Sequence, residues 1–254
     1  MTDAGSINLD FYDEDSAGRE DYWRLMAAPR FRVATLLRLI AHTGTRSLVD
    51  LGCGGGQLLA EVAERFAGVA LAGVDLSPRL VELNRASHPD VEWHTADLDR
   101  PLPAAGGLAG RFETVVASEV VEHVDDPATF LTNAAALARP GATLLLSTQS
   151  GPLRETERRV GHVRHFSRRE MSKLLERAGW QPVRVWNTGF PFHDLSKWYA
   201  NRDPDASMGR FGDGAYGRRE RFVCAALRFA FCFNSRRRGA QLFAVARRPA
   251  ERAV

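Results

Sequence analysis

A glycine-rich turn between an apolar run and an amphipathic segment constrains the fold of this chain most strongly. Residues 47–50 have the composition of a buried strand, and apolar positions recur at helical spacing over residues 58–66. Between these segments Gly52, Gly54 and Gly56 stand at alternate positions. Glycine suits positions where the backbone takes a positive φ or approaches a ligand, and a helix N-terminus presents free N–H groups. The stretch therefore predicts a strand, a ligand-binding turn and a helix.

The spacing of the three glycines separates this turn from a dinucleotide-binding one. The dinucleotide fingerprint is G-x-G-x-x-G, whereas this chain has G-x-G-x-G with an acid two residues before the first glycine. This pattern resembles motif I of the class I S-adenosylmethionine-dependent methyltransferases. The resemblance implies that the turn lies under the methionine part of the cofactor. The cofactor-binding residues that it implies here are Asp50, Gly52, Cys53, Gly54 and Gly56, with Cys53 expected to act mainly in packing.

Two further predicted strands end in acids, in the order that this family uses. Residues 69–75 end at Asp75, and residues 91–98 carry Asp97 near their end. Ligands of open α/β sheets bind at the carboxyl ends of strands, so Asp75 suits hydrogen bonds to the ribose hydroxyls. The resemblance implies that Asp97 bonds the adenine amino group, and Asp99 is the alternative. The remaining candidate cofactor contacts are Leu76, Leu98 and Ser118.

A fourth predicted strand, residues 112–118, leads into the sequence EVVEHV at residues 119–124. This segment resembles the one after motif II in the ubiquinone-biosynthesis O-methyltransferases and their small-molecule relatives. It also matches the Glu-x-x-Glu-His motif of the small-RNA 3′-terminal 2′-O-methyltransferases. Because it follows the carboxyl end of a strand, we expect it to face the transferred methyl group.

Two mechanisms stay open for this segment. In the first, His123 is the general base, with Glu122 beside it, since imidazole has an ordinary pKa of about 6.5. In the second, a divalent cation such as Mg²⁺ or Mn²⁺ binds Glu119, Glu122, His123 and His162, with His165 as the alternative to His162. Such a cation would lower the pKa of the acceptor hydroxyl. A purely structural role of the glutamates, as surface or capping residues, is the third interpretation.

We expect residues 1–44 to form an N-terminal helical cover over the cofactor pocket. Tyr12, Tyr22 and Trp23 are candidate acceptor contacts within it. Arg30 stands in a setting similar to that of an arginine that approaches the cofactor carboxylate in ubiquinone-type enzymes. Packing of the helix against the sheet is the alternative to a cover.

The chain from residue 45 to 254 is expected to form one α/β class I methyltransferase domain. The implied fold is a seven-stranded, mostly parallel, doubly wound sheet, the Rossmann-like methyltransferase fold. Residues 241–247 read as the last strand, which lies antiparallel between its neighbours in the resembled fold. Residues 189–220 lack periodicity and are rich in aromatic side chains, which predicts a lid insertion over an apolar acceptor.

The composition of the chain argues against several classes of protein and partner. No apolar run reaches the roughly 18 residues that a membrane span needs, and no signal-peptide pattern is present, so we expect a cytoplasmic protein without a membrane span. The three cysteines are too scattered for a disulfide framework or a zinc site. Arginines crowd the C-terminal quarter, but no aromatic stacking pattern accompanies them, so nucleic acid is not the expected partner. The oligomeric state stays open.

The resemblance implies methyl transfer from S-adenosylmethionine, with S-adenosylhomocysteine as product. The expected acceptor is a small hydroxylated molecule, such as a natural product or other secondary metabolite. N- or C-methylation of a small molecule is one alternative. Metal-dependent RNA ribose 2′-O-methylation is the other.

Overall fold

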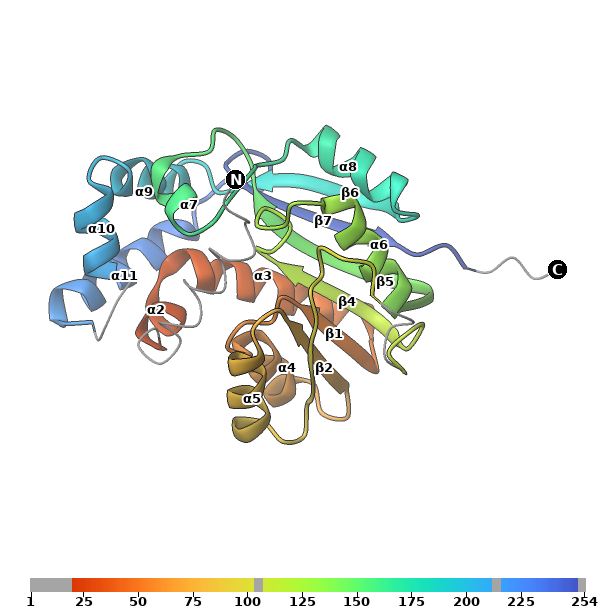
Figure 1. Ribbon diagram of the computed structural model, residues 1–254. Helices are drawn as coiled ribbons and strands as arrows, with labels where there is room; N and C mark the ends of the chain where they lie inside the picture. The colour runs from red at the N-terminus through yellow and green to blue at the C-terminus, as the bar shows by residue number, and fades with distance from the viewer. Residues whose placement is uncertain (1–19, 103–106, 212–215, 251–254) are drawn as a thin grey trace.

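The computed structural model describes residues 20–102, 107–211 and 216–250, which are built around one sheet (Figure 1). Its strands are β1 (Ser47–Leu51), β2 (Ala70–Asp75), β3 (Glu92–Thr95), β4 (Phe112–Ser118), β5 (Ala138–Gln149), β6 (Gln181–Thr188) and β7 (Gln241–Arg247). The seven strands have the order β3-β2-β1-β4-β5-β7-β6, and β7 runs antiparallel to both of its neighbours while the other pairs are parallel. The predicted fold class is therefore confirmed.

Helices cover both faces of the sheet (Figure 1). The first layer is α3 (Ala27–Thr43), α4 (Gln57–Arg65) and α5 (Pro78–Ser87), and the opposite layer is α6 (Pro127–Leu137) and α8 (Arg168–Arg177). The other described helices are α2 (Glu20–Leu25), α7 (Glu155–Arg159), α9 (Phe192–Ala200), α10 (Pro204–Phe211) and α11 (Arg218–Phe231). Within the described ranges, no helix combines the length and apolar character that a bilayer crossing requires.

Helix α3 belongs to the core of the fold. Its side chains Leu36, Leu37 and Ile40 are buried in one cluster with Val116 of β4 and Leu145 of β5. Burial of each such side chain contributes about 1.5–3 kcal/mol. Helix α3, the second part of the predicted N-terminal segment, thus packs on the sheet, and a cover over the cofactor pocket stays a prediction.

The N-terminal segment before α3 contacts the C-terminal part of the chain. The Asp21 carboxylate of α2 accepts a hydrogen bond of 2.9 Å from the Tyr216 N–H and lies 3.4 Å from the Arg221 guanidinium. Tyr22 and Trp23 pack edge to face with ring centroids 5.4 Å apart. Tyr12, a candidate acceptor contact, lies outside the described residues.

The segment predicted as an irregular lid is largely helical. Helices α9 and α10 occupy much of residues 189–220, and α9 follows the carboxyl end of β6. On α9, His193 is buried and packs edge to face with Phe231 of α11, whereas Trp198 and Tyr199 are exposed. The sequence concealed α9 because its one fully buried residue is His193, while Trp198 and Tyr199 face outward.

Candidate functional site

The glycine turn is fixed by hydrogen bonds to β2 and α5. The N–H of Gly52 donates to the Val74 carbonyl over 2.8 Å, and the N–H of Gly54 donates to the Asp75 carboxylate over 2.7 Å. From the other side, the Asn84 side chain donates to the Gly54 carbonyl over 2.7 Å. The turn, the acid at the end of β2 and the helix that follows β2 therefore form one unit. This unit contains the predicted ribose ligand Asp75.

Gly52 joins the turn to the segment that follows β4. Its φ is +69°, and a Cβ at this position would lie 2.5 Å from a γ-carbon of Val120. Gly56 also has a positive φ, +74°, and its Cβ would lie 2.9 Å from the Trp93 ring. Gly54, with φ of +51°, borders open space. The predicted cofactor turn and the Glu119–His123 segment are therefore in direct contact at Gly52.

Asp50 and Cys53 are buried beside the turn. Burial, together with the charge of Asp75, raises the pKa of the Asp50 carboxyl to about 8, and its Oδ1 has no hydrogen-bond partner among the described residues. Burial also raises the pKa of the Cys53 thiol, which stays protonated in the core. Asp50 is therefore available to accept a hydrogen bond, whereas Cys53 fills space.

Asp97 and Asp99 have different surroundings at the end of β3. Asp97 accepts a hydrogen bond of 3.0 Å from the Asp99 N–H and pairs with the Arg100 guanidinium at 3.1 Å. The Asp99 carboxylate accepts from the N–H groups of Asp125 and Asp126 at 3.1 and 2.9 Å. Asp99 thus anchors the loop before α6, which leaves Asp97 as the better candidate for adenine.

The other predicted cofactor contacts are spread around this edge. Arg30 of α3 forms an ion pair with Glu61 of α4, so its guanidinium is already neutralised. Leu98 is buried in the core, and Ser118 lies 3.1 Å from the Ser147 hydroxyl. Leu76 follows β2 and is partly buried. Their roles toward the cofactor stay predictions.

Glu119 turns away from the metal-ligand group that the sequence predicts for it. It has φ of +56°, the one positive value among the described non-glycine residues. Its carboxylate accepts hydrogen bonds from Ser147 over 3.0 Å, from Gln241 over 2.8 Å and from Gln149. Arg32 lies 3.8 Å away. Burial favours a higher pKa for this carboxyl, but the charge of Arg32 and the three donors outweigh burial and lower it.

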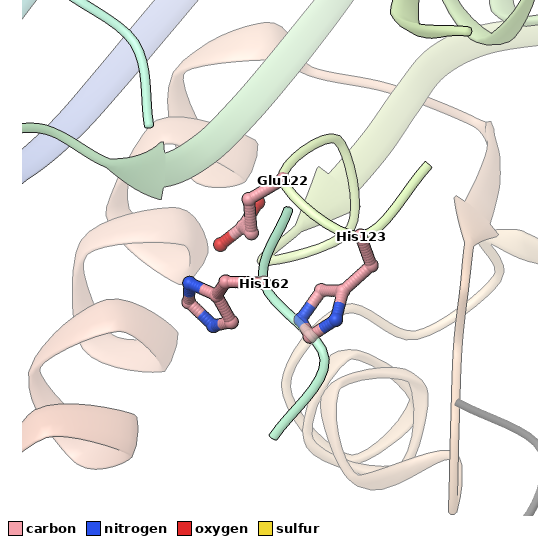
Figure 2. A group of neighbouring side chains, drawn as sticks. All are labelled: Glu122, His123 and His162. Carbon is pink, nitrogen blue, oxygen red and sulfur yellow. The ribbon is translucent and has the colours of Figure 1, made fainter. Parts of the chain in front are cut away.

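Glu122, His123 and His162 converge on one point (Figure 2). Each offers one ligand atom, and these atoms all lie within 4.8 Å of one another. The two imidazole rings meet edge to face with centroids 4.6 Å apart. A backbone hydrogen bond of 2.9 Å from the Val163 N–H to the Glu122 carbonyl joins the two loops. The structure thus brings together three of the four predicted metal ligands.

The electrostatics of this group suit an added positive charge. Burial and the neighbouring Glu119 raise the pKa of Glu122 well above its usual range. The Glu122 Oε1 atom has no hydrogen-bond partner within the described structure, although Oε2 accepts from Thr148 over 2.7 Å. Burial lowers the pKa of His123 to about 4. These three side chains fit a divalent cation, because they pair an unsatisfied carboxylate oxygen with a neutral imidazole.

Burial also keeps the His162 imidazole neutral, and His165 contacts His162 on its far side. Burial, followed by the nearby His123 and His165, lowers the pKa of His162 to about 2. The His162 Nδ1 lies 3.2 Å from the His165 Nε2, and the His165 Nδ1 lies 3.2 Å from the Gly151 carbonyl. His165 is therefore one step removed from the Glu122–His123–His162 group.

Four polar residues around the site were missed by the sequence analysis. Arg32, Gln149 and Gln241 contact Glu119, and Lys197 of α9 donates to Gln149 over 2.8 Å. Arg32 is buried on α3, where a buried arginine implies a charged partner. Two of the others stand at strand ends facing this edge, at the end of β5 and the start of β7. Position at a strand end was the signal that could have identified them.

Comparison with known proteins agrees with this geometry. Residues 22–185 match a family described as the methyltransferase domain. A protein of Mycolicibacterium smegmatis, named as a probable S-adenosylmethionine-dependent methyltransferase, is 31% identical over 170 residues, which cover 64% of this chain and 60% of that protein. A ubiquinone biosynthesis O-methyltransferase of Cereibacter sphaeroides is 40% identical over 102 residues, which are 40% of each chain.

The match to these two relatives therefore spans about half of their length. Among solved structures, the plantazolicin methyltransferase bound to S-adenosylhomocysteine has a TM-score of 0.63 at 13% identity, with 96% of each chain covered. At that identity the likeness concerns the fold alone. The family match covers most of the chain and includes both the glycine turn and the Glu122–His123–His162 group. The chain therefore belongs to the class I S-adenosylmethionine-dependent methyltransferase family.

Proposed function

We propose that this protein transfers a methyl group from S-adenosylmethionine to a hydroxyl of a small molecule. The observation that carries the proposal is the convergence of Glu122, His123 and His162 directly after β4, in contact with the glycine turn through Val120 and Gly52. Groups able to activate a hydroxyl thus adjoin the predicted cofactor site. The curated ubiquinone biosynthesis O-methyltransferases among the relatives support an oxygen acceptor.

The cofactor contacts follow from the strand ends. Bound S-adenosylmethionine supplies an electrophilic methyl on a positively charged sulfur. The glycine turn offers close backbone approach, Asp75 accepts hydrogen bonds from the ribose hydroxyls, and Asp97 accepts one from the adenine amino group. What remains for the acceptor side is to align the oxygen with the methyl and remove its proton.

The acceptor proton goes to the Glu122–His123–His162 group. His123 is neutral at pH 7 and can accept a proton, but its pKa of about 4 makes it a weak base. A divalent cation held by the same three residues would lower the pKa of the acceptor hydroxyl. The unsatisfied Oε1 of Glu122 supports the cation-assisted form, with His123 as base in its absence.

Labelled cofactor tests the proposal and the alternatives together. The protein is incubated with methyl-labelled S-adenosylmethionine and an extract of its source organism, with and without a chelator, and label is measured in small-molecule, RNA and protein fractions. We expect label in small molecules and its loss on chelation. Label that survives chelation would show that no cation is needed and that His123 alone acts as the base. Label in RNA would overturn the small-molecule acceptor.

A further inference from the structure

A cavity of about 460 Å³ lies beyond the Glu122–His123–His162 group, between α9 and the loops that follow β5 and precede β7. This size is within the range of small-ligand sites. The charged residues in its lining are Arg154, Arg168, Asp194, Lys197, Arg237 and Arg238. Five cations and one carboxylate thus line one cavity that is partly open to solvent. Such a lining attracts an anion and repels a cation.

The four arginines of this lining have no carboxylate partner in the described part of the chain. Lys197 pairs with Glu157 at 2.9 Å, and Asp194 is occupied by the Ala240 N–H at 2.9 Å and by the buried His193 at 3.4 Å. By contrast, Arg154, Arg168, Arg237 and Arg238 form no ion pair with any described residue. An oxyanion in the cavity would give these guanidinium groups the partner that they lack.

The loop that carries Arg237 and Arg238 is fixed in place by its backbone. The Ser235 hydroxyl accepts from the N–H groups of Arg237 and Arg238 at 3.1 and 3.2 Å. The Arg238 carbonyl accepts from the Phe190 N–H over 3.0 Å, and the Gly239 carbonyl accepts from the Asn187 side chain over 3.0 Å. None of these bonds uses a guanidinium group. The backbone of the loop is therefore ordered without its guanidinium groups, which leaves the exposed side chains of Arg237 and Arg238 available to an anion.

Two chains of contacts start at the cavity, and one ends at Glu119 while the other ends at His162. Lys197 of the lining donates to Gln149, which in turn donates to Glu119. On the other side, His162 contacts His165, and His165 contacts the carbonyl of Gly151 in the lining. The cavity is thus separated from His162 by the His165 side chain, and an acceptor that spans His165 would place its hydroxyl at the Glu122–His123–His162 group and its far end among the arginines.

We propose that this cavity binds a phosphate group carried by the methyl acceptor. The inference rests on the proposed methyl transfer, and it specifies the acceptor as a phosphorylated hydroxy compound. A phosphate dianion matches four unpaired guanidinium groups better than a singly charged carboxylate, because each of its three terminal oxygens accepts charge-assisted hydrogen bonds. The remaining part of the acceptor lies between the arginines and the imidazoles.

Binding of inorganic phosphate tests the site without cofactor or acceptor. Phosphate is titrated into the full-length protein at constant ionic strength, and the ³¹P line width is followed, with acetate as the competing anion. We expect saturable binding at one site per chain and at least tenfold weaker competition by acetate. The variant Arg237→Gln/Arg238→Gln should bind phosphate at least tenfold more weakly, and so should Arg154→Gln/Arg168→Gln from the opposite side of the cavity.

The matched control is Arg228→Gln/Arg236→Gln, which removes the same charge from exposed positions outside the lining. Its phosphate affinity should stay within twofold of wild type. Equal losses in the control and the cavity variants would overturn the site, as would binding without saturation. Equal affinity for acetate and phosphate would overturn the phosphate assignment.

A second arm separates an acceptor phosphate from a free anion. Inorganic phosphate, compared with chloride at equal ionic strength, should lower methyl transfer to the acceptor fraction of the extract, and the Arg237→Gln/Arg238→Gln variant should lose that inhibition. Phosphate binding without such competition would overturn the acceptor assignment. Titration of the same preparations with S-adenosylhomocysteine tells failure of this proposal from failure of the methyltransferase function.

Discussion

The Thr148 hydroxyl donates a hydrogen bond of 2.7 Å to one oxygen of the Glu122 carboxylate, while the other oxygen has no partner among the described residues. A fully buried carboxylate with half of its acceptor capacity unused is costly unless a cation or a proton occupies the open side. We therefore predict that Glu122→Gln weakens Mn²⁺ binding by about 100-fold or more, since a charged ligand is lost. Calorimetric titration with Mn²⁺ measures this directly.

Glu119→Gln is the matched control for that prediction. Glu119 stands three residues earlier and bears the same charge, but its carboxylate is occupied by Ser147, Gln149 and Gln241. Its substitution should leave Mn²⁺ affinity within about threefold, apart from long-range charge effects. Equal losses in both variants would restore Glu119 to the ligand set. Retained affinity in Glu122→Gln would remove the metal site.

Because the Asp50 carboxyl is buried, we predict that the stability of the fold depends on pH. Its carboxyl has a pKa of about 8 in the fold, against about 3.9 in the unfolded chain. Between these values the folded state holds a proton that the unfolded state releases, so Asp50 lowers stability progressively as pH rises from about 4 to 8. Asp50→Asn removes this titration. Its Tm should exceed that of wild type by several degrees at pH 8, and the two should converge near pH 4.

Thermal unfolding of both proteins across pH 4 to 8, without cofactor, provides the measurement. A constant difference in Tm over this whole range would show that the Asp50 carboxyl ionises normally despite its burial.

Asp75, the proposed ribose ligand, also accepts the hydrogen bond that fixes the glycine turn. Asp75→Ala should weaken S-adenosylhomocysteine binding by about 1–3 kcal/mol, the usual cost of losing a charged hydrogen-bond partner. Asp75→Asn keeps one acceptor oxygen for the Gly54 N–H and should lose less affinity. Calorimetric titration with S-adenosylhomocysteine ranks the three proteins. Unchanged affinity in Asp75→Ala would mean that the ribose is held by other groups.

Gly52 and Val120 should behave as a coupled pair. Gly52→Ala introduces a Cβ 2.5 Å from the Val120 side chain as well as strain at φ of +69°. Gly44→Ala has a similar φ of +60° but meets nothing within 4 Å, so it isolates the strain, which costs about 1–2 kcal/mol. We expect Gly52→Ala to be the more destabilising, and Val120→Ala in the same chain to recover the difference. Denaturant unfolding of wild type, Gly44→Ala, Gly52→Ala, Val120→Ala and the double variant decides whether the two sites couple.

Much of the fold could be predicted from local pattern. Strands such as β1 and β4 are buried along most of their length because helices cover both faces of the sheet, and their apolar residues make them recognisable. Positive φ angles at Gly52, Gly54 and Gly56 match a turn that only glycine forms easily. Acids at the ends of β2 and β3 lie at one edge because parallel strands end there together. These features depend on residues close in sequence, so the sequence displays them.

The polar network around Glu119 could not be predicted in this way. One backbone angle, φ of +56°, turns its side chain toward β5 and β7 instead of toward His123. Its partners Gln149 and Gln241 are 30 and 122 positions away in the chain. Spacing alone indicates which residues share an edge, but it does not give the direction of each side chain. For the same reason, the sequence did not predict the contact between Arg32 and Glu119 or the four arginines that line the cavity.

The antiparallel strand β7 constrains the order in which the sheet can assemble during synthesis. Because β7 forms hydrogen bonds with both β5 and β6, these two strands cannot be joined until residues 241–247 have been synthesised. Gln241, at the start of β7, also completes the set of donors to Glu119. The polar network around Glu119 is therefore complete only when the seventh strand of this sheet has been synthesised, whereas the glycine turn and its hydrogen bond to Asp75 depend on earlier residues alone.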